Sequence, residues 1–226
     1  MLRYGGAGGF QVELRLAGTL TAAQQNVVAA AVERWSKIVT GPETPAHEFK
    51  GSVFHGLVLN VRAGFDKKGG RLATTESLES WESGPLEGLP RVAKITFDTA
   101  DLADLESRGQ LLDAAIHEVG HALGIGVGWR HRGLVEKESS GTLAFRGTAS
   151  MEAYGRLRGV GTPLPVPIDP GSGKGDEHWQ EKTFASELMT PTLNKGTQPI
   201  SQLTVASLKD LGFQVNPQGA DGFKLP

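Results

Sequence analysis

The feature that most constrains this chain is a group of ionisable side chains inside an otherwise apolar segment. His117, Glu118 and His121 form the pattern His-Glu-x-x-His within residues 110–123, where Leu, Ala, Ile and Val predominate. One helical turn separates the two histidines, so a helix presents both imidazoles on the same face. Imidazoles and carboxylates lose their hydration on burial, which is costly unless they find partners. The segment therefore predicts a central, largely buried helix that uses these three side chains for binding.

A divalent cation suits this spacing. Zinc accepts imidazole nitrogens at about 2.0–2.1 Å, and a catalytic zinc has three protein ligands and one open position. Glu118 follows His117 directly and is placed to act as the general base toward a metal-activated water. With six histidines in the chain, composition alone would produce the pattern about once in a hundred such sequences. A zinc site at His117 and His121 is therefore expected, with Glu118 as its catalytic residue.

The third ligand lies further along the chain. Gly124 predicts the end of the motif helix, because a left-handed glycine redirects the backbone. A compact motif would have its third histidine at position 127, which is Val127.

Several downstream residues could supply that ligand. His131 stands between two arginines, whose charges disfavour binding of another cation, whereas His178 follows two acidic residues. An acidic third ligand is the alternative, and three candidates are available: Glu136, Glu138 and Glu152.

Composition bounds the remaining choices. The 226 residues, 38% hydrophobic and 21% charged, suit a single domain with an N-terminal part over 1–124 and a C-terminal part over 125–226. The net charge of −2 gives no argument for nucleic acid or an anionic membrane as partner. The chain has no cysteine, which excludes thiolate ligands.

No apolar stretch is long enough to span a membrane and no signal core is present. We expect a secreted protein whose signal is absent from this chain, with a cytoplasmic location as the alternative.

The hydrophobic pattern predicts an α+β fold with one mixed, twisted sheet and two long helices in the N-terminal part. A capping box at Thr21 opens the first helix, which Gly41-Pro42 should end. The segment from 125 to about 180 is rich in Gly, Pro and Ser and predicts an irregular lobe. The other expected elements are strands over 10–16, 53–61, 72–74 and 92–97, a turn at Gly69-Gly70, and helices over 110–123, 150–157 and 201–211.

The motif and its downstream context resemble a known family. Residues 117–124 (HEVGHALG), then His178-Trp179 and the run 187–190 (ELMT), resemble the leishmanolysin branch of the metzincin zinc metallopeptidases. The likeness extends over about residues 10–215. The chain departs from the larger, disulfide-rich eukaryotic members and looks like a minimal prokaryotic version. In that branch a long insertion precedes the third histidine, which the resemblance places at His178. Met189 would then be the Met-turn residue beneath the zinc.

The resemblance implies a metzincin-type fold and a zinc metalloendopeptidase, here expected to be a monomer that acts on protein or peptide substrates. The strand near 91–97 would be the sheet edge along which an extended peptide pairs. The competing interpretation is a non-catalytic zinc-binding interaction module. A structural zinc would need four protein ligands, and the intact Glu118 together with the lack of cysteine argues against it. Tyr154 could assist catalysis, although a packed aromatic residue is the favoured interpretation.

Overall fold

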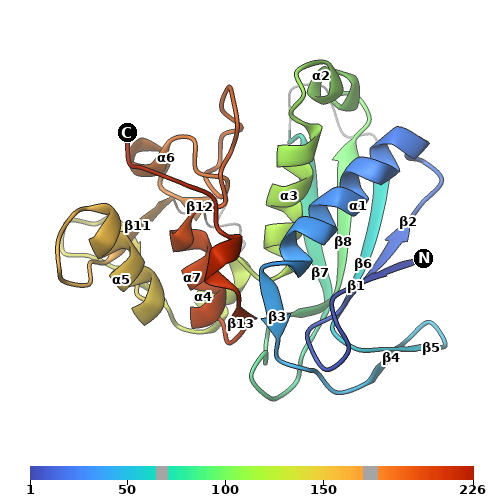
Figure 1. The fold of residues 1–226 in the computed structure, drawn as a ribbon, viewed down its shortest axis with the longest axis horizontal. Helices are drawn as coiled ribbons and strands as arrows, with labels where there is room; N and C mark the ends of the chain where they lie inside the picture. Colours follow the sequence, from blue (N-terminus) through green and yellow to red (C-terminus); the bar gives the residue numbers. More distant parts are fainter. Residues whose placement is uncertain (65–70, 170–177) are drawn as a thin grey trace. The chain divides into compact units, whose positions relative to one another are not determined.

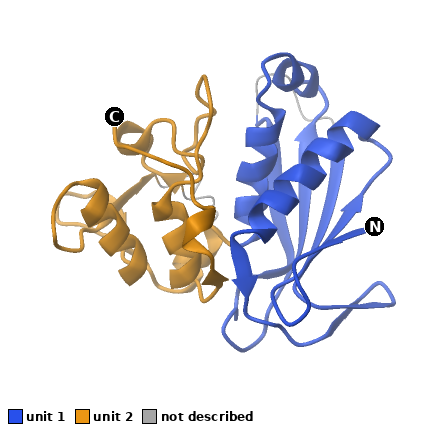
Figure 2. Cartoon of the chain, viewed as in Figure 1, with its two compact units in different colours: residues 1–123 blue, residues 124–226 orange. Residues whose placement is uncertain are grey.

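The computed structural model describes residues 1–64, 71–169 and 178–226. The chain divides into two compact units, which are Met1–Leu123 (unit 1) and Gly124–Pro226 (unit 2), as Figure 2 shows. The turn predicted at Gly69-Gly70 lies outside the described residues. None of the helices in the described ranges is long and apolar enough to cross a membrane.

Unit 1 is built on a five-stranded mixed sheet (Figure 1). In spatial order its strands are β1 (Leu2–Tyr4), β2 (Val12–Leu16), β6 (Leu57–Gly64), β8 (Pro90–Asp98) and β7 (Ala73–Ser80). Strands β2, β6 and β8 run parallel, while β1 and β7 pair antiparallel at the two edges. The expected mixed sheet is therefore confirmed.

The edge strand differs from the prediction. The strand over 91–97 was expected at the edge, but β8 pairs with β6 on one side and β7 on the other. The edge strand is β7, which is longer than the predicted strand over 72–74. Its sequence, ATTESLES, contains a single large apolar side chain. An edge strand needs little apolar surface, so its pattern is easily taken for a loop.

A glycine divides the strand predicted over 53–61. The structure has β5 (Ser52–Phe54), which pairs with β4 (His47–Phe49), and then β6 from Leu57. Gly56 lies between them with φ of +80°, and a Cβ there would approach the Gln11 carbonyl oxygen to 1.9 Å. Only glycine can therefore bring the chain this close to β2.

Helices α1 (Ala22–Ser36) and α3 (Leu111–Ala122) lie side by side over the sheet of unit 1 (Figure 1). The capping box at Thr21 is confirmed, because Thr21 Oγ1 accepts from Gln24 N and Gln24 Oε1 accepts from Thr21 N. The end predicted at Gly41-Pro42 is wrong. The helix stops at Ser36, since the apolar residues 38 and 39 instead lead into β3 (Val39–Gly41). A short helix, α2 (Leu102–Ser107), precedes α3.

Unit 2 is more regular than its composition predicts. It contains a four-stranded antiparallel sheet in the spatial order β12-β11-β10-β9. These strands are short, and their bounds are β9 (Val135–Lys137), β10 (Leu143–Phe145), β11 (Val166–Asp169) and β12 (His178–Trp179). The helices of unit 2 are α4 (Val127–His131), α5 (Thr148–Leu157), α6 (Glu181–Phe184) and α7 (Gln202–Asp210). Helices α5 and α7 match the predictions over 150–157 and 201–211. The prediction of an irregular lobe is wrong. Strands of two to four residues are too short to show an alternating hydrophobic pattern in the sequence.

Aromatic rings fill the core of unit 2. Trp129, Phe145, Trp179 and Phe184 are all fully buried. The Trp129 and Trp179 ring centroids lie 4.3 Å apart, and the Phe145 and Trp179 centroids 5.6 Å apart. Trp179 is the neighbour of His178 in β12, so this core fixes the backbone that carries the histidine.

Asp210 connects two helices of unit 2. It is the last residue of α7, and its carboxylate accepts hydrogen bonds from the backbone N–H of Ala149 and Ser150 in the first turn of α5. Gly147 permits this contact, since a Cβ at that position would lie 2.2 Å from Asp210 Oδ2. The side chain of one helix thereby caps the beginning of another.

Trp35 joins α1 to α3 next to the motif, and its contribution can be measured. Its indole N–H donates to the Ile116 carbonyl oxygen at 2.8 Å. The indole N–H of Trp81 is also buried but has no hydrogen-bond partner among the described residues. Trp35→Phe should therefore cost about 1 kcal/mol of unfolding free energy more than the control Trp81→Phe. Urea unfolding measures both, and equal losses would contradict the role of this bond.

Candidate metal centre

Helix α3 positions the two histidines of the motif. His117 and His121 are both half-buried, and their Nε2 atoms lie 3.0 Å apart. Two nitrogens at about 2.0–2.1 Å from a tetrahedral zinc would be roughly 3.3 Å apart, which is close to this separation. In the metal-free protein one imidazole can donate its proton to the other. When each ring instead has its proton on Nδ1, both Nε2 lone pairs can bind a shared cation.

His178 completes the group. One ligand atom from each of His117, His121 and His178 lies within 4.8 Å of the others, so the group could hold a metal ion. No other cluster of three His, Cys, Asp or Glu with this property occurs within residues 1–64, 71–169 and 178–226. All three donors are imidazole nitrogens, a set that suits zinc and also other transition metals.

The alternative third ligands are occupied or exposed. His131 is exposed at the end of α4 and does not belong to the histidine group. Glu136 and Glu138 both form salt bridges with Arg146, at 3.1 and 2.7 Å. Glu152 is exposed on α5.

Glu118 is a buried carboxylate that is only partly satisfied. Its side chain is 9% exposed. Oε2 accepts a hydrogen bond of 2.5 Å from the Thr75 hydroxyl, whereas Oε1 has no hydrogen-bond partner in the described part of the chain. Burial raises the pKa of Glu118, and three neighbours oppose this effect: the charge of His117, the Thr75 hydrogen bond and the charge of Arg71. One oxygen is thus held while the other can still accept a proton.

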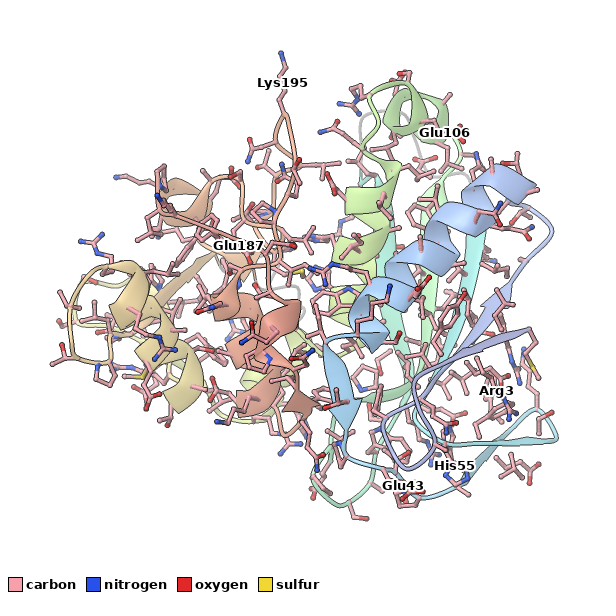
Figure 3. All side chains as sticks on the ribbon, in the orientation of Figure 1. Arg3, Glu43, His55, Glu106, Glu187 and Lys195 are labelled. Carbon is pink, nitrogen blue, oxygen red and sulfur yellow. The ribbon has the colours of Figure 1, made fainter. Side chains whose placement is uncertain are left out.

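Glu187 gives a useful contrast within the same chain. Its carboxylate is fully buried and lies at the start of α7 (Figure 3). Oε2 accepts from the backbone N–H of Met189, and Oε1 accepts from the N–H and hydroxyl of Ser201 and from the hydroxyl of Thr204. Burial raises the pKa of Glu187, and these four hydrogen bonds oppose it. With both oxygens used by fixed donors, Glu187 is a structural group.

The Glu187 network reaches the segment that carries His178. The Thr204 hydroxyl also accepts the indole N–H of Trp179, at 2.7 Å. The backbone N–H of Trp179 donates to the Met189 carbonyl oxygen at 2.9 Å, and Met189 is fully buried. The run 178–190 therefore folds as one hydrogen-bonded assembly. It places the residues of the motif's downstream context, which are far from α3 in sequence, around a common buried carboxylate.

Gly124 and Tyr154 agree with the sequence predictions. Gly124 has φ of +101°, as expected for a helix-ending glycine. Tyr154 is buried and packs against Phe184 at 5.4 Å between ring centroids, which fits the packed interpretation. Sequence reasoning missed Thr75 altogether, and it did not anticipate the buried hydrogen-bond network of Glu187.

Comparisons with known proteins add no assignment. No protein-family model matches the chain, and no curated protein matches it significantly. The functional argument therefore depends on the residues themselves.

The hydrogen bonds of Glu187 predict a large effect of a small change. Glu187→Gln replaces one acceptor oxygen with an amide donor, which leaves a buried N–H facing another donor. The variant should lose about 1–3 kcal/mol of unfolding free energy. Glu152→Gln is the control, because Glu152 is exposed on α5, and it should change stability little. Chemical denaturation measures both, and equal stabilities would contradict the structural role of Glu187.

The histidine group predicts which histidines affect metal affinity. His178→Ala should weaken zinc binding by more than about 100-fold, since even residues behind the ligands contribute about 10–100-fold. The control His131→Ala should leave zinc affinity unchanged. Competition with a chromogenic chelator measures both constants. The reverse order of effects would show that the third ligand is misassigned.

Proposed function

We propose that this protein is a zinc-dependent endopeptidase of the metzincin type, similar to the leishmanolysin branch. The observation that carries the proposal is the group formed by His117, His121 and His178, with Glu118 next to it in α3. Three neutral imidazoles leave a tetrahedral ion one open position, which is the arrangement of a catalytic zinc. The run from His178 to Thr190 supports the likeness, because its residues are joined by hydrogen bonds around Glu187.

Zinc bound there would polarise a peptide carbonyl and lower the pKa of water. The chain itself supplies the proton transfer. No described residue donates a hydrogen bond to Glu118 Oε1, so this oxygen can accept a proton from a water molecule in the site and later give it to the leaving amine. The burial that raises its pKa favours this cycle, because a carboxylate of very low pKa would hold the transferred proton poorly.

The sheet edge offers a place for the substrate. Strand β7 pairs only with β8 among the described residues, so its other edge can pair with an extended peptide. Two ion pairs, Glu76 with Lys94 and Glu79 with Arg91, join β7 to β8. An extended substrate would thus add to the strand whose Thr75 contacts Glu118, which favours a peptide over a compact small molecule.

The second candidate function is a zinc-binding interaction module without catalysis. One feature speaks against it, namely that a buried glutamate follows His117 directly and has an oxygen to which no described residue donates. A module that only binds zinc gains nothing from that arrangement, which costs desolvation.

Glu118→Gln distinguishes the two functions. The amide keeps the size of the side chain but cannot act as a base, so peptide cleavage should fall by about 100-fold or more. Zinc stoichiometry should remain at one ion per chain. The measurement combines cleavage of an unstructured protein such as casein with metal analysis of the same sample. Cleavage equal to that of the unmodified protein would overturn the proposed mechanism.

A further inference from the structure

The contact between Thr75 and Glu118 is the most specific polar interaction of the candidate base. Thr75 lies in β7, where it pairs with Ile95 of β8. Its hydroxyl lies 2.5 Å from Glu118 Oε2 and 3.1 Å from the Glu118 carbonyl oxygen. Both partners belong to unit 1.

A hydroxyl has one proton, so the two acceptors compete for it. An ionised carboxylate accepts a much stronger hydrogen bond than a neutral carbonyl, and O–H···O⁻ bonds have lengths of about 2.5–2.7 Å. The shorter of the two contacts is the one to the carboxylate. The hydroxyl proton is therefore assigned to Oε2, and this hydrogen bond makes Oε2 the weaker proton acceptor of the two oxygens.

The backbone around Thr75 makes this contact rigid. Ladder hydrogen bonds with β8 hold the strand, and a β-branched side chain has few rotamers to adopt. A fixed donor on one oxygen sets the rotation of the carboxylate plane. That rotation determines where the other oxygen, Oε1, points.

We propose that Thr75 is a positioning residue, which holds Oε2 so that Oε1 alone serves as the proton acceptor. This inference rests on the proposed peptidase function. Thr75 acts only through Glu118 and need not touch the substrate. Its contribution should therefore appear in the rate of turnover rather than in substrate binding.

Three variants test the proposal by activity. Thr75→Val keeps the shape of the side chain but removes the hydroxyl, and kcat should fall by about 10- to 100-fold with KM and zinc stoichiometry unchanged. Thr75→Ser keeps the hydroxyl and should retain most of kcat. Thr96→Val is the matched control, because Thr96 lies in β8 and its hydroxyl accepts a hydrogen bond from Arg62 Nε rather than bonding to Glu118. It should behave like the unmodified protein.

A second measurement does not depend on turnover or on metal. In the metal-free protein, the Thr75 hydroxyl proton should give an NMR signal well downfield of ordinary threonine hydroxyls, because a short bond to an anion deshields it. Glu118→Ala leaves only the backbone carbonyl as acceptor, so the signal should move upfield. An ordinary chemical shift that Glu118→Ala does not alter would overturn the assigned contact.

The outcomes separate this inference from the proposed function. If Glu118→Gln abolishes cleavage but Thr75→Val retains full kcat, the positioning role of Thr75 is wrong and the peptidase assignment stands. If Glu118→Gln cleaves as well as the unmodified protein, the peptidase mechanism fails, and the positioning role fails with it. A loss of kcat in Thr75→Val that Thr75→Ser restores supports the proposal.

Discussion

The cost of burying a carboxylate in an apolar helix governs the candidate site. Glu118 lies in α3 among Leu, Ala, Ile and Val, and desolvation disfavours its charged form. The sheet edge offsets that cost with a single strong donor, Thr75, while His117 adds a favourable charge. The placement of α3 against β7 is therefore central to the candidate site, because Thr75 of β7 gives the carboxylate its one hydrogen bond within the described residues.

Glu187 and Glu118, one buried glutamate from each unit, show opposite solutions to the same physical problem. Glu187 uses all of its acceptor capacity on four donors from its own unit, so its charge is bound into the packing of unit 2. Glu118 is also buried, but within the described residues only its Oε2 receives a hydrogen bond. A buried carboxylate whose oxygens all accept hydrogen bonds is held rigidly, whereas one with an oxygen left over can still accept a proton. The difference indicates a structural role for Glu187 and supports the chemical role proposed for Glu118.

The parts of the fold that the sequence could predict are those with a strong local signal. The capping box at Thr21, the glycine end at Gly124 and the apolar helix around the motif all follow from short-range chemistry. Strand β7 lacks such a signal, because its side chains are mostly polar and its stability comes from pairing with β8. The strands of unit 2 are too short to show periodicity. The contact of Thr75 with Glu118 joins residues 43 positions apart, and no sequence pattern indicates it. The environment of Glu118 depends on tertiary pairing, which leaves no local pattern in the sequence.

The position of Asp210 affects how helices α5 and α7 of unit 2 fold and unfold. A negative charge at the last residue of α7 opposes the dipole of its own helix, but the same charge favours the beginning of α5. The final turn of α7 is therefore at its most stable only while α5 is docked against it. The two helices, joined by a contact between residues 60 positions apart along the chain, should open as one cooperative segment. Their slowest backbone amide protons should consequently share a single protection factor.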